Sequence, residues 1–260
     1  MSSVGAEPQV QTARNGAVFT VTLSRGPVNA LDDGLVDALD TAVAAATADP
    51  DIAVLHLRSS CKVFCAGADL ALMQDSIRTP EGLERMLALV RRLQQLAARI
   101  EAAPLVTLAE IGGAALGGGF EMALACDLRI AAHEARIGLP EAGLGLLAAA
   151  GGTQRLTRLV GPGLAKRLIL GAETVDGATA ERLGLVQWSA PRAELPEAAR
   201  ALVERLAKLP RAATSAGKQC IAAALDPARD GFAEEIAHTR TLYRHPVTRE
   251  LVTAFLARTR

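Results

Sequence analysis

Two glutamates and a run of glycines are the residues of this chain best suited to chemistry. Gly117–Gly119 stand between an expected strand at 105–108 and a helical face that begins at Phe120. Glycine lacks a Cβ atom, so a substrate can approach this backbone closely, and free N–H groups at a helix start favour negative charge. The turn is therefore suited to stabilising a developing oxyanion. Glu121 lies in the first helical turn, where a plainer interpretation is a carboxylate that suits the helix dipole.

The second carboxylate, Glu141, follows Pro140 in an apolar segment punctuated by glycines. A carboxylate among Leu139, Leu144 and Leu146 would be desolvated, which raises its pKa unless it finds a partner. Two carboxylates that face one cavity can hold a water molecule between them and divide the roles of acid and base. A third segment, 63–70, reads VFCAGADL and forms another turn of small residues after an expected strand.

Other catalytic and metal-binding patterns are missing from the sequence. It contains no GxSxG nucleophile motif, no GxxxxGK phosphate loop and no HExxH zinc pair. The four histidines are scattered without partners, and Cys61 and Cys65 lack both a CxxC spacing and a nearby histidine. Four cysteines in 260 residues do not make a disulfide framework, so we expect free thiols and no metal site.

Composition excludes some classes of partner. Lysine plus arginine number 28, as do aspartate plus glutamate, and aromatic residues make up 3% of the chain. A neutral chain with few stacking side chains is not typical of a nucleic-acid-binding protein. No uninterrupted apolar run is long enough to span a membrane, and residues 1–8 lack the features of a signal peptide, so we expect a cytoplasmic protein.

The periodicity of apolar residues predicts the elements that would position these groups. Asn15-Gly16 predicts a hairpin turn between two strands, and Leu31, Leu35, Leu39 and Val43 predict a helix. Further strands are expected at 52–57, 105–108, 128–132, 135–138 and 185–188, and helical faces at 83–100, 120–128, 153–160, 164–170, 194–209 and 231–257. The chain is therefore expected to be an α/β protein with a mixed core at 1–191 and a helical region at 192–260.

Five segments in order resemble the enoyl-CoA hydratase/isomerase (crotonase) family. They are PVNALD at 27–32, FCAGADL at 64–70, ALGGGFEMALACDLRIA at 115–131, PEAGLGL at 140–146 and GGTQRLTRLVG at 151–161. The resemblance implies a spiral of ββα units followed by a C-terminal helical trimerisation region, in a homotrimer or a homohexamer. It also implies acyl-CoA thioester substrates, with coenzyme A entering as part of the substrate and no separate cofactor.

The resemblance also assigns roles to residues. The oxyanion-hole amides of the family fall on Ala68 and Gly118, and its two catalytic glutamates fall on Glu121 and Glu141. Both glutamates together favour hydration of a trans-2-enoyl-CoA to the 3-hydroxyacyl-CoA. Glu121 would help to remove a proton from the attacking water, and Glu141 would supply a proton to Cα. The alternatives are a double-bond isomerase and a non-catalytic acyl-CoA-binding protein.

The binding segment for CoA is expected along residues 66–70. These residues are Ala66, Gly67, Ala68, Asp69 and Leu70. Arg25 resembles a basic position near the CoA phosphates, although a solvated arginine at a strand end is an equal alternative. Relatives usually carry a proline before the AGG segment, where this chain has Ala148 and Ala149. Without proline the turn is less stiff, which would affect the wall behind the water and the shape of the acyl pocket.

Overall fold

The computed structural model describes residues 8–258 and builds them around a six-stranded sheet. The strands are β1 (Val10–Asn15), β2 (Val18–Leu23), β3 (Val54–Ser59), β4 (Val106–Ile111), β6 (Leu128–Ala132) and β9 (Trp188–Ala190), in the spatial order β1-β2-β3-β4-β6-β9. The β1–β2 pair is antiparallel and the pairs that follow are parallel. Parallel neighbours need long crossovers, and the helices of the chain supply them.

The first two strands form the hairpin that the sequence predicts, but its turn lies one residue further along. Asn15 pairs with Val18, so Gly16 and Ala17 are the turn residues. Gly16 has a φ of +57°, which glycine adopts without steric cost, whereas Asn15 stays in the strand. The prediction that Asn15 and Gly16 form the turn was therefore wrong by one residue. Gly16 takes a positive φ in the turn, whereas Asn15 stays paired with Val18 in the hairpin.

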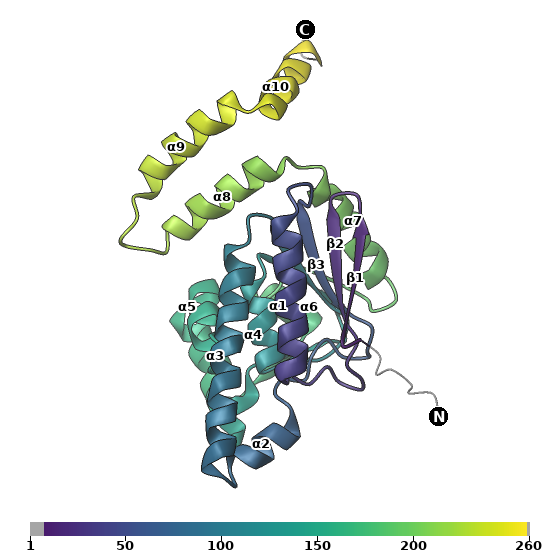
Figure 1. The fold of residues 1–260 in the computed structure, drawn as a ribbon, viewed down its shortest axis with the longest axis vertical. Helices are drawn as coiled ribbons and strands as arrows, with labels where there is room; N and C mark the ends of the chain where they lie inside the picture. The colour runs from purple at the N-terminus through teal and green to yellow at the C-terminus, as the bar shows by residue number, and fades with distance from the viewer. Residues whose placement is uncertain (1–7, 259–260) are drawn as a thin grey trace.

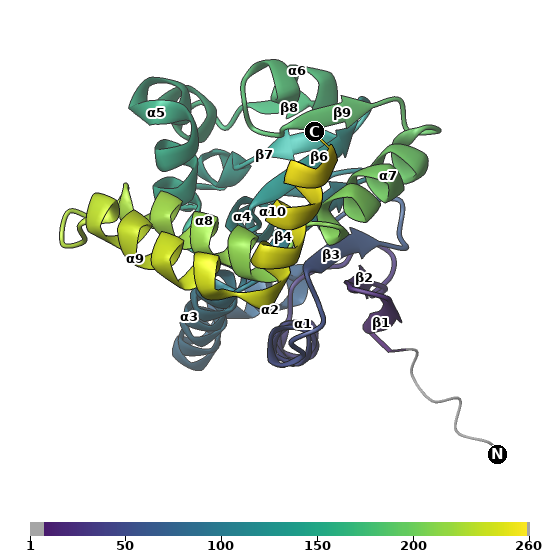
Figure 2. The same ribbon diagram turned by 90° about the horizontal axis from the view of Figure 1, so that it is seen from above.

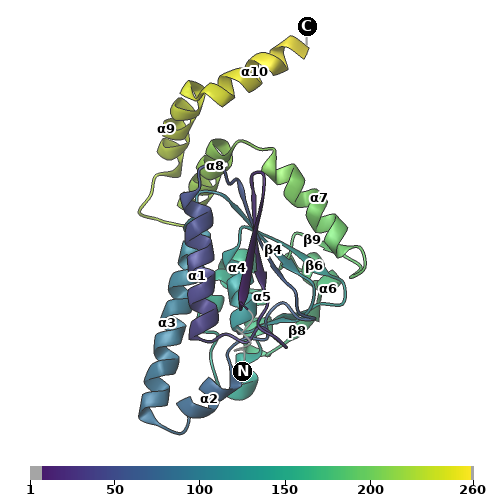
Figure 3. The ribbon, with the colours of Figure 1, turned by 45° about the vertical axis from the view of Figure 1, so that its right-hand side comes forward.

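Helices cover both faces of the sheet. Helix α1 (Asp33–Ala48) and helix α3 (Pro80–Ala102) lie side by side on one face, and helix α7 (Leu195–Ala207) packs against β2, β3, β4, β6 and β9 on the other (Figure 3). The four-residue spacing at the start of α1 is the buried stripe that the sequence predicts, with Leu35, Leu39 and Val43 in the core. Asp32 caps α1 by accepting a hydrogen bond from the Leu35 amide at 2.8 Å.

A smaller sheet carries the glycine-rich turn. It consists of β5 (Ala115–Leu116), β7 (Arg136–Gly138) and β8 (Thr174–Asp176), in the order β5-β7-β8. Helix α4 (Gly118–Ala125) follows β5 directly, and the short 3-10 helix η1 (Pro140–Leu144) follows β7. Since β5 and β7 are paired, the elements that carry the two glutamates leave the same sheet side by side.

The C-terminal helices extend away from this body. Helices α8 (Arg211–Ala223), α9 (Gly231–Arg244) and α10 (Pro246–Arg258) follow α7, and α9 and α10 reach furthest from the sheet (Figures 1 and 3). Seen from above, α8 and α9 run side by side (Figure 2). Polar contacts attach α8 to the body: Arg211 donates to the carbonyls of Thr47 and Pro104, and Lys218 pairs with Asp127 at 2.9 Å. The division into 1–191 and 192–260 stays a prediction, and α7 packs on the sheet although it lies beyond residue 191.

Several elements, most of them short, were not predicted. They are α2 (Leu70–Ser76), β5, η1, β8, α6 (Gly177–Arg182) and the longer α8. Elements of six or seven residues offer less than two helical turns, too few for a periodic pattern, and α8 buries only alanines in its own chain. The helical face expected to continue to Leu128 instead ends at Ala125, because Leu128 begins β6. Within residues 8–258, no helix combines the length and apolar character needed to cross a membrane.

Candidate active site

The glycine-rich turn places the backbone amide of Gly118 at the start of α4. Gly117 has a φ of +52° and its N–H donates to the Gly138 carbonyl at 3.0 Å, which leaves the Gly118 N–H as the first amide of the helix. Side chains do not fit here: a Cβ atom on Gly118 would lie 2.8 Å from Leu31 Cδ1, and one on Gly119 would lie 2.3 Å from the Cys65 carbonyl oxygen. Glycine is therefore required for this backbone to pack as closely as it does.

The second candidate amide, that of Ala68, lies beside the first. Leu31 forms a parallel bridge with Ala68, in which the Leu31 N–H donates to Gly67 and the Leu31 carbonyl accepts from Asp69. In such a bridge the N–H of Ala68 itself points away from Leu31. A Cβ atom on Gly67 would lie 3.7 Å from the Gly118 nitrogen, so the two backbones are neighbours. The structure thus places the segment that carries Ala68 against the start of α4, and convergence of the Ala68 and Gly118 amides on one point stays a prediction.

Arg25 holds the loop that carries Ala68. Its guanidinium pairs with Asp69 and with Asp32, at 2.9 Å each, and donates to the Ala30 carbonyl at 3.0 Å. Asp69 in turn caps α2 by accepting from the Ala71 amide at 2.8 Å. Burial alone would raise the pKa of Asp69, but the Ala71 amide and Arg25 outweigh burial and hold this pKa below its usual value. Arg25 is therefore an anchor of the loop in this structure, and its contact with CoA phosphates stays a prediction.

Glu121 is buried at the base of this pair of amides. Its side chain is 4% exposed, and its Oε1 atom accepts a hydrogen bond from the Gly152 amide at 2.7 Å. Burial raises the pKa of Glu121 to about 7; the Gly152 amide opposes the shift and the charge of Glu141 adds to it. A carboxyl group with this pKa exchanges protons readily near neutral pH.

Glu141 approaches the same turn from η1. A Cβ atom on Gly117 would lie 3.0 Å from Glu141 Oε1, and one on Gly118 would lie 4.0 Å from Glu121 Oε2. The Oε2 atom of Glu141 is buried and has no hydrogen-bond partner within residues 8–258. Burial raises the pKa of Glu141 as well. Adjacent residues of one turn therefore border both carboxylates, and one of them offers a free acceptor.

The enclosure of Glu141 differs from the expected one. Leu139 is buried, but Leu144 and Leu146 are exposed, at 69% and 51%. These two leucines therefore do not enclose the carboxylate in this chain, and the backbone at Gly117 closes one side of it instead. Their exposure leaves apolar side chains at the rim of the site.

The segment around Ala148 and Ala149 forms the wall behind Glu121. Ala148 is buried, and the Ala149 carbonyl accepts a hydrogen bond from Gln94 Nε2 of α3 at 2.6 Å. A Cβ atom on Gly152 would lie 2.8 Å from Glu121 Oε1, so glycine is needed for the amide of Gly152 to reach the carboxylate. The role of Gly152 was missed in the sequence, although it lies in the AGGTQRL segment that carried the resemblance.

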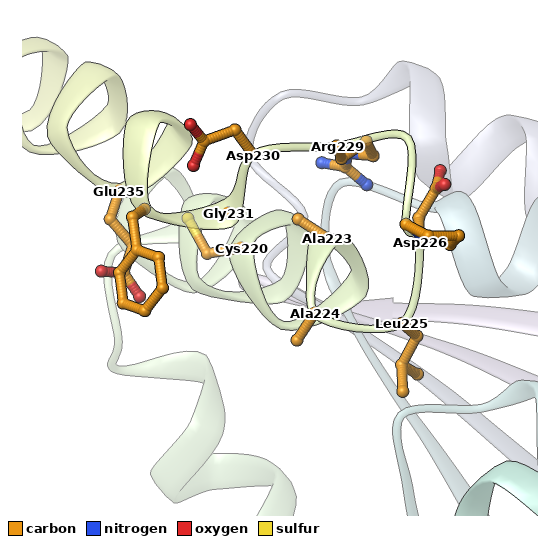
Figure 4. Close-up of a pocket in the computed structure, with 11 residues that line it drawn as sticks. Cys220, Ala223, Ala224, Leu225, Asp226, Arg229, Asp230, Gly231 and Glu235 are labelled. Carbon is orange, nitrogen blue, oxygen red and sulfur yellow. The ribbon is translucent and has the colours of Figure 1, made fainter.

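Two hollows differ sharply in their relation to these residues. A cavity of about 10 Å³, the space of roughly one water molecule, adjoins Gly118 and Glu121 and is otherwise lined by Leu93, Leu96, Ala97, Met122 and Ala150. A larger hollow of about 600 Å³ lies at the turn between α8 and α9, where Cys220, Asp230 and Glu235 line it (Figure 4). The larger hollow contains none of the candidate catalytic residues, so volume does not mark the active site here.

The absence of a metal ion and of a separate cofactor at this site stays a prediction. No group of three or more histidine, cysteine or acidic side chains that could hold a metal ion occurs within the described part of the chain, residues 8–258. Cys65 is fully enclosed, and burial raises the pKa of its thiol to about 12, so it is neither a ready nucleophile nor a ready ligand. The groups available for chemistry at this site are two carboxyl groups and two backbone amides.

Comparison with known proteins agrees with this geometry. Residues 13–259 match the family described as "Enoyl-CoA hydratase/isomerase". The mitochondrial enoyl-CoA hydratase domain-containing protein 2 of Mus musculus is 43% identical over 79% of this chain and 70% of its own length. Pseudomonas aeruginosa DspI superposes with a TM-score of 0.89 at 36% identity, over 99% of this chain and 97% of its own. The enoyl-CoA hydratase of Bacillus anthracis superposes with a TM-score of 0.89 at 30% identity, over 96% of each chain.

These likenesses confirm the predicted crotonase-like α/β fold and the resemblance drawn from the five sequence segments. They extend over nearly the whole chain, and the matched range, residues 13–259, contains the glycine turn, the Ala68 loop and both glutamates. The chain belongs to the enoyl-CoA hydratase/isomerase family.

Proposed function

We propose that this protein is an enoyl-CoA hydratase, which adds water across the 2,3 double bond of a trans-2-enoyl-CoA thioester to give the 3-hydroxyacyl-CoA. The observation that carries the proposal is the pair of carboxyl groups beside one glycine turn. Glu121 accepts from the Gly152 amide, while the buried Oε2 atom of Glu141 has no hydrogen-bond partner in the described part of the chain. A water molecule held between them would be oriented towards a substrate carbon above the turn.

In the proposed reaction each group has one task. The Ala68 and Gly118 amides donate hydrogen bonds to the thioester oxygen, which becomes negative as the enolate-like transition state forms. Glu121 takes a proton from the water molecule while the oxygen of that water bonds to Cβ, and Glu141 gives a proton to Cα. The electron pair of the double bond thereby forms the new C–H bond, and the thioester regains its neutral form. No separate cofactor is required for this addition.

Hydration of crotonyl-CoA tests the proposal directly. Loss of the absorbance of the conjugated thioester, together with recovery of 3-hydroxybutyryl-CoA, is the expected result. The alternative is a double-bond isomerase, which would convert a 3-enoyl-CoA to the 2-enoyl ester and leave crotonyl-CoA unchanged. A non-catalytic binder would bind saturated and unsaturated esters equally and turn over neither. The pair Glu121 and Glu141 favours hydration, because water addition needs both a base and an acid.

The CoA arm is proposed to lie along residues 66–70. Ala66 and Leu70 are exposed there, whereas Gly67 is buried against the glycine turn, so the segment offers an open edge that leads to the paired amides. Binding of the arm by backbone groups of this segment would bring the thioester to Ala68. The exposed leucines at 144 and 146 lie at the rim near Glu141, where an acyl chain can cover them.

We also propose that the chain assembles as a homotrimer or homohexamer. Large apolar side chains stay exposed along α9 and α10, among them Phe232, Ile236, Tyr243 and Leu251. Many large exposed apolar side chains on neighbouring helices are unusual on a monomer and typical of an interface. Light scattering coupled to size-exclusion chromatography should give three or six times 27.0 kDa. A mass of one chain at micromolar concentration would contradict assembly.

A further inference from the structure

The PVNALD segment, residues 27–32, carried part of the family resemblance, yet it contributes none of the groups used in the proposed reaction. Its central residue, Asn29, is fully buried and has a φ of +50°. Among residues with a side chain, asparagine is one of the few that enter the left-handed region readily. The position therefore combines an unusual backbone with a polar side chain placed out of reach of water.

Asn29 binds two other segments of the chain. Its Nδ2 atom donates to Ser59 Oγ at 2.8 Å and to the Phe64 carbonyl at 2.9 Å. Its own carbonyl accepts from Cys65 Sγ at 3.1 Å. Burial keeps the pKa of that thiol near 12, so the thiol stays protonated and available as a donor. One residue thus connects the end of β3 with the segment that leads to Ala68.

The contacts of Asn29 and Leu31 hold the segment 64–68 at both of its ends. Asn29 fixes the end at Phe64 and Cys65, and Leu31, two residues further along, pairs with Ala68 through the parallel bridge. Between them the Ala66 amide donates to the Val28 carbonyl at 3.0 Å. The direction in which the Ala68 N–H points is therefore set by this short stretch and not by the loop alone.

We propose that Asn29 is a positioning residue: its side-chain amide fixes the register of segment 64–68 and so aims the Ala68 amide at the same point as the Gly118 amide. This inference rests on the proposed function, since it concerns the oxyanion site of the hydration reaction. Aspartate would not substitute, because its carboxylate lacks the N–H donors that Ser59 and Phe64 require. A glycine would adopt the same backbone but would leave the Phe64 carbonyl without its donor.

The decisive variant is therefore Asn29→Gly, which keeps the left-handed backbone and removes only the side-chain hydrogen bonds. We expect kcat for crotonyl-CoA to fall by about tenfold to a hundredfold, because the Ala68 amide would be displaced from the thioester oxygen but not removed. KM should change less than kcat, because only residues 66–68 of the proposed CoA-binding segment would shift and both glutamates are untouched. The chain has one other asparagine, Asn15, which is exposed at the hairpin, so Asn15→Gly is a matched control that should leave kcat unchanged.

A spectroscopic measurement separates positioning from a merely structural role. Amides that polarise a thioester carbonyl shift the absorption of a bound cinnamoyl-CoA to longer wavelength. In Asn29→Gly this red shift should shrink, while circular dichroism and the melting temperature show a folded protein. Should that variant not fold, Ser59→Ala removes one of the two acceptors of the Asn29 amide, and a smaller loss of kcat and of red shift is expected.

The outcomes distinguish the two proposals. A wild-type protein that neither hydrates crotonyl-CoA nor shifts the cinnamoyl absorption refutes the proposed function and the role of Asn29 with it. An active wild type together with a folded Asn29→Gly or Ser59→Ala variant of full kcat and full red shift overturns the role of Asn29 alone.

Discussion

Replacement of Glu121 by glutamine should lower activity and raise stability at the same time. The pKa of Glu121 is raised by burial to about 7, against an ordinary value of 4.5. Above pH 7 the carboxyl group is ionised in both the folded and the unfolded chain, and the folded chain bears the cost of a buried charge. From the two pKa values this cost is about 3 kcal/mol, since one pKa unit corresponds to about 1.36 kcal/mol.

The sign follows from the direction of the shift. Below about pH 4.5 Glu121 is protonated in both the folded and the unfolded chain, so it does not change the free energy of unfolding. As pH rises from about 4.5 through 7, the group ionises first in the unfolded chain, and the free energy of unfolding of the wild type therefore falls. Glutamine is neutral throughout and keeps an oxygen that can accept from the Gly152 amide. The free energy of unfolding of Glu121→Gln should therefore exceed that of the wild type by up to about 3 kcal/mol at pH 8 and by little at pH 4.5.

Urea denaturation followed by circular dichroism at pH 4.5, 6 and 8, at one protein concentration, measures this difference. Glu84→Gln, at an exposed position on α3, is the matched control and should show no such pH-dependent gain. In parallel, kcat for crotonyl-CoA should fall by about 10²–10⁴-fold in Glu121→Gln, as for loss of a general base. A variant whose stability follows that of the wild type at every pH would refute the argument that burial of an ionised Glu121 is costly.

Four further predictions concern the two carboxyl groups and their surroundings. Glu141→Gln should reduce kcat by a comparable factor without loss of binding of a saturated acyl-CoA. Wild-type kcat/KM should fall as pH drops below about 7, where Glu121 gains its proton. A flat pH profile would argue against Glu121 as the base. Gly152→Ala should reduce kcat while the protein still folds, because the new Cβ would lie 2.8 Å from Glu121 Oε1 and displace it; unchanged kinetics would show that the Gly152 contact is dispensable. Arg25→Gln should lower kcat for crotonyl-CoA and for a crotonyl thioester of pantetheine alike, since it releases Asp69; a rise in KM confined to the CoA ester would show instead that Arg25 binds phosphate.

The parts of this fold and site that the sequence predicted are those encoded by local pattern. The apolar stripe at Leu35 and Leu39 predicted α1, and the three glycines at 117–119 predicted a turn open to close approach. The pairing of Arg25 with two aspartates was not predicted, because partners that lie 7 and 44 residues away leave no periodic signal. The Gly152 amide on Glu121, 31 residues apart, was missed for the same reason.

The two carboxyl groups lie in unlike surroundings, and this difference matters more for the proposed reaction than their proximity. Glu121 is the more deeply buried, but the Gly152 amide binds one of its oxygens and stabilises its ionised form. Glu141 is less deeply buried, its own backbone amide opposes the rise in its pKa, and its Oε2 atom has no hydrogen-bond partner within residues 8–258. Two neighbouring carboxyl groups take the separate roles of acid and base when their surroundings stabilise the ionised form of one more than that of the other. The two surroundings therefore differ, and the division of roles, with Glu121 as the base that receives the proton of water and Glu141 as the acid that delivers one to carbon, stays part of the proposal that the two glutamine variants test.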